Sequence, residues 1–156
     1  MSARIHFSAA QLLPAAPEAL FSFFMQPQNI RLLTPPGMRV QVVSTTHDPL
    51  AEGAEITYIF HKFGLPLRWR ARITDVQPGL QFTDEQLRGP FRYWRHCHRL
   101  IPAPGGGCTV QDDITLELPF GALGRLVWRW FLRRDVARTF AARQQVLARL
   151  CEEGAL

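Results

Sequence analysis

Apolar and polar residues alternate along most of residues 4–118, and the pattern then becomes helical. In residues 4–13, Ile5, Phe7 and Ala9 alternate with polar neighbours, as they do in a strand with one buried face. The alternation returns in further segments separated by turn-forming residues, namely 40–45, 55–61, 67–76, 82–87, 91–100 and 108–118. The pattern predicts a curved antiparallel sheet of about seven strands.

Two short helices are expected between the first and second strands. Pro17 suits the first turn of a helix, and Glu18 suits the positive end of its dipole. Pro27 interrupts this helix, residues 28–33 form a second one, and the stretch 34–37 ends it because it contains two prolines and a glycine. We expect this helical pair to close one edge of the sheet.

One long helix is expected from Ala122 to Glu152. Its apolar residues recur at three- and four-residue steps, which is the stripe of an amphipathic helix. The stripe consists of Leu123, Leu126, Val127, Trp130, Ala137, Phe140, Ala141, Gln144, Leu147 and Cys151. A sheet that wraps around this helix buries the stripe on its concave face, so the predicted fold class is α+β.

The hairpin expected from Phe82 to Leu100 has an unusual face. Side chains alternate along a strand, so the even-numbered positions of both strands point the same way. These positions hold Phe82, Asp84, Gln86, Trp94, His96 and His98. Aromatic rings, two imidazoles, a carboxylate and an amide on one face are not typical of an ordinary core, so we expect this face to line a site.

The register of this hairpin follows from its turn. A turn formed by residues 88–90 alone places Trp94 opposite Asp84, and His96 opposite Phe82.

We expect the last strand to pair with this hairpin across a glycine-rich loop at residues 102–107, with Pro102 opposite Cys108. This pairing places His98 opposite Asp112, and we expect these two side chains to form a buried pair. The neighbouring Asp113 is predicted to face solvent.

The composition is that of an ordinary globular domain. Hydrophobic residues make up 47% of the 156 residues and charged residues 20%, so we expect one folded domain over residues 1–156 rather than a disordered chain. The formal net charge of +5 comes almost entirely from arginines, which are spread over the predicted strands and helix. We therefore expect no nucleic-acid partner.

The cysteines and the N-terminal residues bear on the expected cellular location. Cys97, Cys108 and Cys151 lack CxxC spacing, so neither a disulfide framework nor a cysteine zinc site is predicted. The N-terminus has no apolar stretch after a basic start, and no uncharged run reaches about 18 residues. These features favour a cytoplasmic protein.

The order of elements and four motifs resemble the START-like or SRPBCC superfamily, which has the helix-grip fold. The motifs are Asn29–Pro36, Gly64–Trp69, Phe82–Leu100 and Leu118–Gly121. Within the superfamily, the chain is similar to a bacterial ligand-binding subfamily often described as polyketide cyclase-like or cell-division-inhibitor-like. The resemblance implies a deep, largely apolar pocket between sheet and helix for a lipid-like or polycyclic molecule. It implies no shared catalytic motif, and we expect no obligatory cofactor.

The residues expected to bind the ligand lie on the inward faces of the predicted elements. They are Trp69, Phe82, Asp84, Gln86, Trp94, His96, His98, Asp112, Trp130, Ala137, Phe140 and Ala141. In the leading interpretation, a few polar groups anchor a mainly apolar molecule, which is sequestered or transported. A structural alternative is that Asp84 and Gln86 only satisfy buried hydrogen-bond donors.

Three other interpretations use the same residues or the helix. His96, His98 and Asp112 form an acid–base set for a cyclase-like or hydrolase-like enzyme. Two histidines and a carboxylate also suit Fe(II) or zinc, but their spread along separate strands favours no metal. Finally, a helix face formed by Arg125, Trp128, Arg129 and Leu132 suits a protein- or membrane-docking adaptor or a homodimer surface.

Overall fold

A computed structural model describes residues 4–62 and 64–156. It begins with strand β1, the helical turns α1, η1 and α2, and strand β2; these are Ile5–Leu13, Pro17–Phe24, Pro27–Asn29, Ile30–Leu33 and Arg39–Thr45. Five more strands follow, β3 to β7, at Glu55–Lys62, Leu65–Gln77, Gln81–Arg88, Tyr93–Pro102 and Cys108–Glu117. The chain ends in helix α3 (Gly121–Val127), a π-helical segment η2 (Trp128–Leu132) and helix α4 (Arg133–Glu152).

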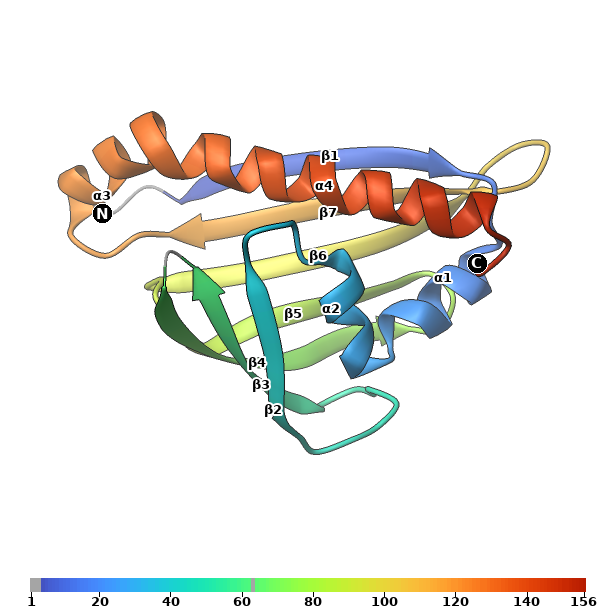
Figure 1. Ribbon diagram of the computed structural model, residues 1–156, viewed down its shortest axis with the longest axis horizontal. Coiled ribbons are helices and arrows are strands. Elements are labelled where there is room, and N and C mark those ends of the chain that lie inside the picture. The colour runs from blue at the N-terminus through green and yellow to red at the C-terminus, as the bar shows by residue number, and fades with distance from the viewer. Residues whose placement is uncertain (1–3, 63) are drawn as a thin grey trace.

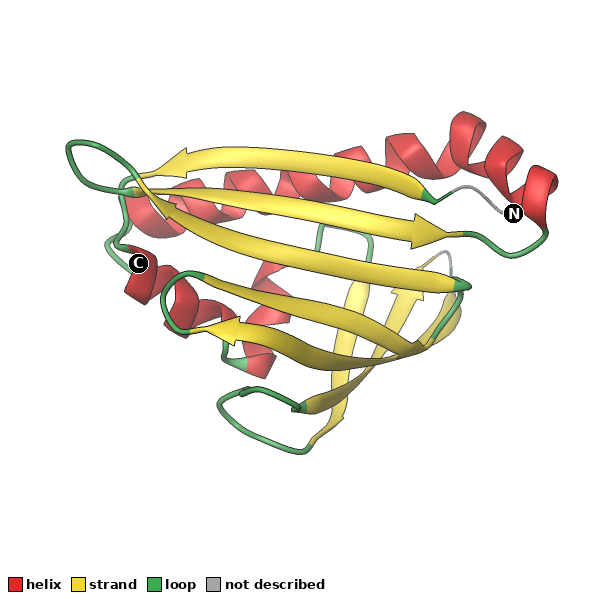
Figure 2. Ribbon diagram, turned by 180° about the vertical axis from the view of Figure 1, so that it is seen from behind, coloured by secondary structure: helices red, strands yellow, loops and turns green. Residues whose placement is uncertain are grey.

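The strands form one antiparallel sheet in the order β1-β7-β6-β5-β4-β3-β2. The sheet curves, and α4 runs along the face that also carries α1 and α2 (Figures 1 and 2). The predicted α+β helix-grip arrangement is therefore confirmed, including the two short helices after the first strand.

Two apolar clusters join the sheet to the helices. One packs the C-terminal part of α4 and the helix α1 against β3, β4 and β5, and includes Leu20, Ile73 and Leu147. The other packs Trp128 and Phe140 against β1 and β7. Between these two clusters, the inward face of the sheet carries buried polar side chains instead of apolar ones.

The central hairpin differs from its predicted register by two residues. Asp84 lies opposite His96, and Phe82 lies opposite His98. The loop is longer than the turn predicted from sequence, because β5 ends at Arg88 and β6 begins only at Tyr93. A shift of two residues leaves every side chain on its predicted face, since the side-chain period of a strand is two.

The pairing across the glycine-rich loop agrees with the sequence. His98 lies opposite Asp112, as predicted.

The long helix differs from its prediction around residues 128–132. A π-helical turn holds more residues than an α-helical turn. The residues that face the sheet in this region are therefore spaced four apart, and not alternately three and four apart. Gly124, Trp128 and Phe140 are buried there, whereas Trp130 is 61% exposed. The predicted inward position of Trp130 is therefore wrong, as are those of Leu123 and Leu126, both of which are exposed.

Within the described part of the chain, no helix combines the length and the apolar character needed to cross a membrane.

Candidate functional site

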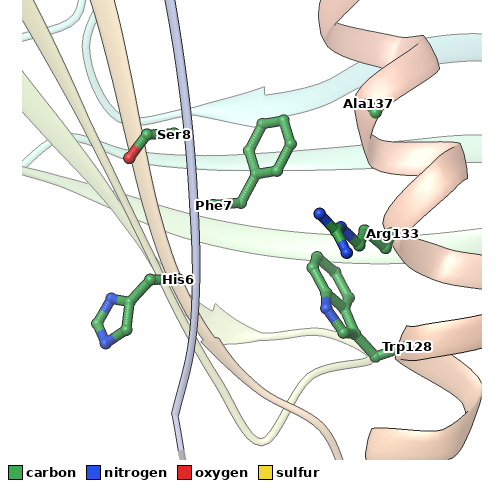
Figure 3. Close-up of a pocket in the computed structure, with 6 residues that line it drawn as sticks. All are labelled: His6, Phe7, Ser8, Trp128, Arg133 and Ala137. Atoms are coloured by element: carbon green, nitrogen blue, oxygen red, sulfur yellow. The ribbon is translucent and has the colours of Figure 1, made fainter.

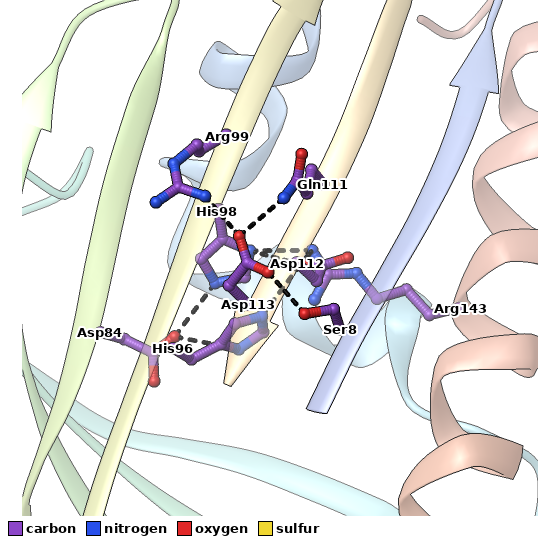
Figure 4. A network of polar contacts seen from close by, with 9 residues as sticks. All are labelled: Ser8, Asp84, His96, His98, Arg99, Gln111, Asp112, Asp113 and Arg143. Atoms are coloured by element: carbon purple, nitrogen blue, oxygen red, sulfur yellow. Dashed lines mark hydrogen bonds and ion pairs between the residues drawn. The ribbon is translucent and has the colours of Figure 1, made fainter. Parts of the chain in front are cut away.

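Two histidines and two aspartates meet on the helix-facing side of the sheet (Figure 4). Asp84 comes from β5, His96 and His98 from β6, and Asp112 from β7. Strand pairing sets Asp84 beside His96 and His98 beside Asp112, and the alternation of side chains turns all four toward α4. We call these four residues the His–Asp cluster.

Each ring nitrogen of the His–Asp cluster faces a carboxylate oxygen. Asp112 Oδ1 lies 2.9 Å from His96 Nε2 and 2.9 Å from His98 Nδ1. Asp84 Oδ2 lies 3.0 Å from His98 Nε2 and 3.4 Å from His96 Nδ1. The two imidazole rings lie 3.7 Å apart between centroids. The cluster is thus a closed cycle of two rings and two carboxylates.

The protons in this cycle are too few for neutral histidines. A neutral imidazole carries one N–H, so two of them supply two protons to four nitrogen–oxygen contacts. Burial and the charge of His98 lower the pKa of His96, which favours its neutral form. His96 therefore meets Asp112 and Asp84 with a single proton. The contact of His96 Nδ1 with Asp84 Oδ2 is longer than that of His96 Nε2 with Asp112 Oδ1, as expected if Nδ1 carries no hydrogen and its lone pair faces the oxygen.

Arg143 of α4 supplies positive charge to the cluster. Its Nη2 lies 3.5 Å from Asp112 Oδ1 and 3.3 Å from His98 Nδ1. Burial opposes ionisation of Asp112, but Arg143 and the hydrogen bonds from both histidines outweigh it and hold the pKa of Asp112 well below its usual value. Burial likewise opposes ionisation of Asp84, and contacts with His98 and His96 outweigh it and lower the pKa of Asp84. Both aspartates are therefore carboxylates at neutral pH.

Apolar rings enclose the cluster on three sides. Phe82 stacks on His98 with 4.2 Å between ring centroids. Phe24 of α1 lies 5.9 Å from the same ring, and Phe140 of α4 lies 5.5 Å from that of His96. A charged network in such a surround is costly to leave unpaired, so these contacts fix its geometry.

The remaining side of the cluster is formed by five half-buried aromatic residues, which we call the aromatic wall. Its members are Tyr58, Phe60, Trp69, Phe91 and Trp94. Trp69 and Trp94 meet edge to face at 5.2 Å, and Trp94 lies 6.4 Å from the ring of His96. The wall therefore continues directly from the cluster along β3, β4, the loop between β5 and β6, and β6 itself.

Asp84 is the cluster member that opens toward solvent. Its side chain is 24% exposed, compared with 6% for Asp112. Burial and the nearby charge of Asp84 raise the pKa of the Tyr58 hydroxyl. The partly exposed carboxylate of Asp84 is thus near the protonated phenol of Tyr58 and the apolar wall, a combination that suits a molecule with one polar end.

Sequence reasoning missed Tyr58 and Arg143, although each left a signal. Tyr58 pairs with Trp69 across β3 and β4, so the register of that hairpin places both on one face. Arg143 follows Phe140 by three residues and precedes Leu147 by four, so it belongs to the inward stripe of α4. A charged residue in that stripe needs a buried partner, which is Asp112.

Gln86 has a structural task. Its Nε2 donates a hydrogen bond to the carbonyl oxygen of Phe91 at 2.8 Å, and the Phe91 N–H donates to its Oε1 at 3.4 Å. A Cβ atom on Gly89 would lie 2.3 Å from that same Oε1. Gly89 therefore provides space for the Gln86 side chain, and the structural alternative for Gln86 is favoured over a ligand contact.

Two alanines of the predicted pocket are exposed in the structure. Ala141 is exposed, so its predicted inward position is wrong. Ala137 is also exposed and lines a hollow of about 520 Å³ between β1 and the helix. Phe7, Trp128 and Arg133 line the same hollow, where Phe7 points toward the helix and its neighbours His6 and Ser8 point away (Figure 3).

The π-helical turn at Trp128–Leu132 also changes the predicted docking face. Trp128 is buried against β1 and β7, and Leu132 packs beside it. In the stretch 120–132, the exposed large apolar residues are instead Phe120, Leu123, Leu126, Val127, Trp130 and Phe131. Arg125 and Arg129 are exposed as expected.

Comparison with known proteins places this fold and site in context. A family model described as polyketide cyclase/dehydrase and lipid transport matches residues 13–143. No curated protein matches the sequence.

Solved structures share the fold at low sequence identity. A protein from Chromobacterium violaceum has a TM-score of 0.71 and 17% identity, with 94% of this chain and 97% of that chain covered. Norcoclaurine synthase from Thalictrum flavum has a TM-score of 0.71 and 11% identity, with 100% and 99% covered. The di-domain ARO/CYC protein StfQ of the steffimycin biosynthetic pathway has a TM-score of 0.74 and 15% identity, and the match covers 97% of this chain and 52% of StfQ.

Proposed function

Because this chain belongs to the polyketide cyclase/dehydrase and lipid transport family of the START-like superfamily, we propose that it binds a hydrophobic small molecule between sheet and C-terminal helix. Residues 1–156 act as one binding domain. The ligand is lipid-like or polycyclic, its apolar body lies against the aromatic wall, and its polar end meets Asp84.

One observation carries this proposal. An ionised, mostly buried network opens at a single carboxylate, Asp84, beside half-buried aromatic rings. Ligand pockets of small molecules combine these features, because apolar contacts supply affinity and a few polar groups fix orientation. Asp84 accepts hydrogen bonds, so the ligand end that it recognises is a donor such as a hydroxyl or an amine.

Native mass spectrometry of the purified protein tests binding directly. We expect a co-purifying molecule that organic extraction removes, and Asp84→Asn should reduce its occupancy because the amide replaces a charged acceptor. The exposed Glu152→Gln removes a similar charge outside the site and should change nothing. Absence of any bound molecule, together with no binding of apolar probes, would contradict the proposal.

Acid–base catalysis on the bound molecule is a second candidate. The contact of His96 Nδ1 with Asp84 Oδ2 lacks a proton when His96 is neutral, so this pair is able to accept one from a ligand. The test is exchange of an acidic ligand hydrogen with deuterated water, followed in the wild type and in His96→Gln. Equal exchange in both proteins excludes this role for His96.

A further inference from the structure

We propose that Asp84, His96 and His98 bind a divalent transition-metal ion such as Zn²⁺ or Fe²⁺. The ligand atoms are Asp84 Oδ2, His96 Nδ1 and His98 Nε2. The sequence disfavours a metal because these residues lie along separate strands, but strand pairing brings one ligand atom of each within 4.8 Å of the others.

The distances suit such an ion. Metal–ligand bonds of about 2.0–2.1 Å in tetrahedral geometry separate neighbouring ligand atoms by about 3.3 Å. Asp84 Oδ2 lies 3.0 Å from His98 Nε2 and 3.4 Å from His96 Nδ1. The two histidine nitrogens lie within 4.8 Å of each other, so small side-chain shifts bring all three ligand atoms to these separations.

An ion also corrects the shortage of protons. With the metal on the Asp84 side, neutral His96 donates its Nε2–H to Asp112, and neutral His98 donates its Nδ1–H to the same carboxylate. Both contacts measure 2.9 Å. The two remaining ring nitrogens then have lone pairs directed at a cation instead of an oxygen. Both imidazoles are then uncharged. Because His98 Nδ1 carries a hydrogen in this arrangement, Arg143 Nη2 donates to Asp112 and not to that nitrogen.

The Asp112 carboxylate would orient the two histidine ligands of the ion. Histidine ligands of metals usually donate their second N–H to a carboxylate or carbonyl, which fixes ring orientation and raises ligand basicity. Here one carboxylate serves both histidines, and Arg143 Nη2 lies 3.5 Å from it. The buried Asp112 is therefore a positioning residue, while the more exposed Asp84 is a ligand.

The open side of the site defines what the metal does. Three protein ligands leave at least one coordination position free, as in catalytic zinc sites. That position lies on the exposed side of Asp84, near Tyr58 and the aromatic wall. It suits a hydroxyl oxygen of the hydrophobic ligand, so this inference rests on the proposed function and narrows the polar end of its ligand to a hydroxyl group.

Metal titration of untagged, chelator-treated protein tests the inference. We expect one equivalent of Co²⁺, used as a spectroscopic substitute for Zn²⁺, with a visible absorption band and a rise in Tm on Zn²⁺ addition. Asp84→Asn should remove most of this binding, and Asp112→Asn should weaken it about 10–100-fold. The exposed His47→Gln is the matched control and should bind like the wild type.

Two results would overturn the metal site. One is incorporation below about 0.2 equivalents by folded wild-type protein, a threshold for incidental loading. The other is a folded Asp84→Asn variant that binds as tightly as the wild type. Apolar probe binding by the metal-free protein is measured separately, so failure of the metal site is distinguishable from failure of the proposed function.

A separate observation concerns the exposed apolar residues of α3 and η2, which we call the α3 face. Leu123, Val127 and Trp130 recur at three- and four-residue steps, so they share one side of the helix, and Phe120 precedes its first residue. Phe131 is 71% exposed and Phe120 is 80% exposed, and Phe120 has a left-handed backbone (φ 66°). A left-handed backbone raises the conformational energy of a bulky residue. An exposed aromatic ring is also unfavourable in water, and contact with an apolar partner would remove that exposure.

We infer that the α3 face docks on an anionic lipid surface. Residues 118–134 contain four arginines and no acidic residue. Arginines beside exposed aromatic and aliphatic residues are the composition of helices that lie in a membrane interface. A second copy of the chain fits less well, because a twofold contact would bring eight arginines (four from each copy) together without acidic partners from this stretch. The face adjoins Trp128 and Arg133 of the hollow beside β1.

Vesicle co-sedimentation tests this docking. We expect binding to vesicles containing phosphatidylglycerol and little to pure phosphatidylcholine. Trp130→Ser with Phe131→Ser should lower partitioning at least about tenfold, and Arg125→Glu with Arg129→Glu about 20-fold or more. Matched controls are Leu12→Ser with Leu80→Ser and Arg31→Glu with Arg39→Glu, which change exposed residues elsewhere. Absence of vesicle binding would overturn docking, as would self-association that the Trp130 and Phe131 changes abolish.

Discussion

His98 Nδ1 lies 2.9 Å from Asp112 Oδ1 across strands β6 and β7, in the buried centre of the protein. The same carboxylate oxygen lies 2.9 Å from His96 Nε2 and faces Arg143. Asp112 is thus the common partner of two buried histidines and the half-buried Arg143. Its removal leaves both histidines with the carboxylate of Asp84 alone, and Arg143 loses its contact at 3.5 Å.

We therefore expect Asp112→Ala to destabilise the fold by about 3–5 kcal/mol, the usual cost of breaking a buried pair. Urea denaturation measures this loss. The sequence suggests Asp113 as a neutral control, but that residue accepts hydrogen bonds from Ser8 and Gln111 and pairs with Arg99.

Glu153 is the better control for Asp112. It makes one exposed contact with Arg149 at 3.8 Å, so Glu153→Ala should cost within about 0.5 kcal/mol. Equal losses for Asp112→Ala and Glu153→Ala would contradict the importance of the cluster.

Tyr58 should make stability fall in alkaline solution. Burial and the charge of Asp84 raise the pKa of Tyr58 in the folded state, so the folded protein keeps this proton after the unfolded chain has lost it. Its contribution to stability is full below the unfolded value of about 10 and declines as pH rises above it. Denaturation at pH 8 and at pH 11 should show a smaller alkaline loss for Tyr58→Phe than for the wild type.

Absorbance provides a second readout of the same group. The chain has two tyrosines, Tyr58 and Tyr93. Ultraviolet absorbance of the folded wild type should show that one tyrosine stays protonated until the protein unfolds, and Tyr58→Phe should remove that late step. A wild type in which both tyrosines titrate together while folded would refute this assignment.

Trp94→Ala should weaken binding of an apolar fluorescent probe by about tenfold or more, because it removes the ring between Trp69 and His96. Trp130→Ala removes the same side chain from the surface of the helix. A probe that binds inside the protein should be insensitive to it. If Trp130→Ala has the larger effect, the probe occupies the α3 face and the interior site loses its support.

Gly89→Ala should cost about 1 kcal/mol through the loss of a hydrogen bond made by Gln86. The added Cβ would lie 2.3 Å from Gln86 Oε1, so that side chain must leave Phe91. In a Gln86→Ala background, Gly89→Ala should cost much less. A double-mutant cycle by urea denaturation measures this coupling, and additive losses would show that Gly89 serves another purpose.

The sequence by itself determined the elements, their order and the direction of most side chains. Period-two alternation requires only local geometry, so Asp84, His96 and His98 were correctly placed on one face even though the predicted hairpin register was wrong. The short loop at residues 103–107 fixed the pairing of His98 with Asp112 for the same local reason.

Only the tertiary structure decided which side chains meet. The convergence of Asp84 with both histidines depends on a longer loop, whose length is set by contacts between Gln86 and Phe91 that no periodicity reveals. The exposed position of Trp130 depends on a π-helical turn that lets Trp128 pack against β1 and β7. Such a turn rotates all the preceding helical residues about the helix axis relative to the residues that follow it. The packing of Trp128 that accompanies the turn involves residues of β1, which are more than a hundred positions away in the chain.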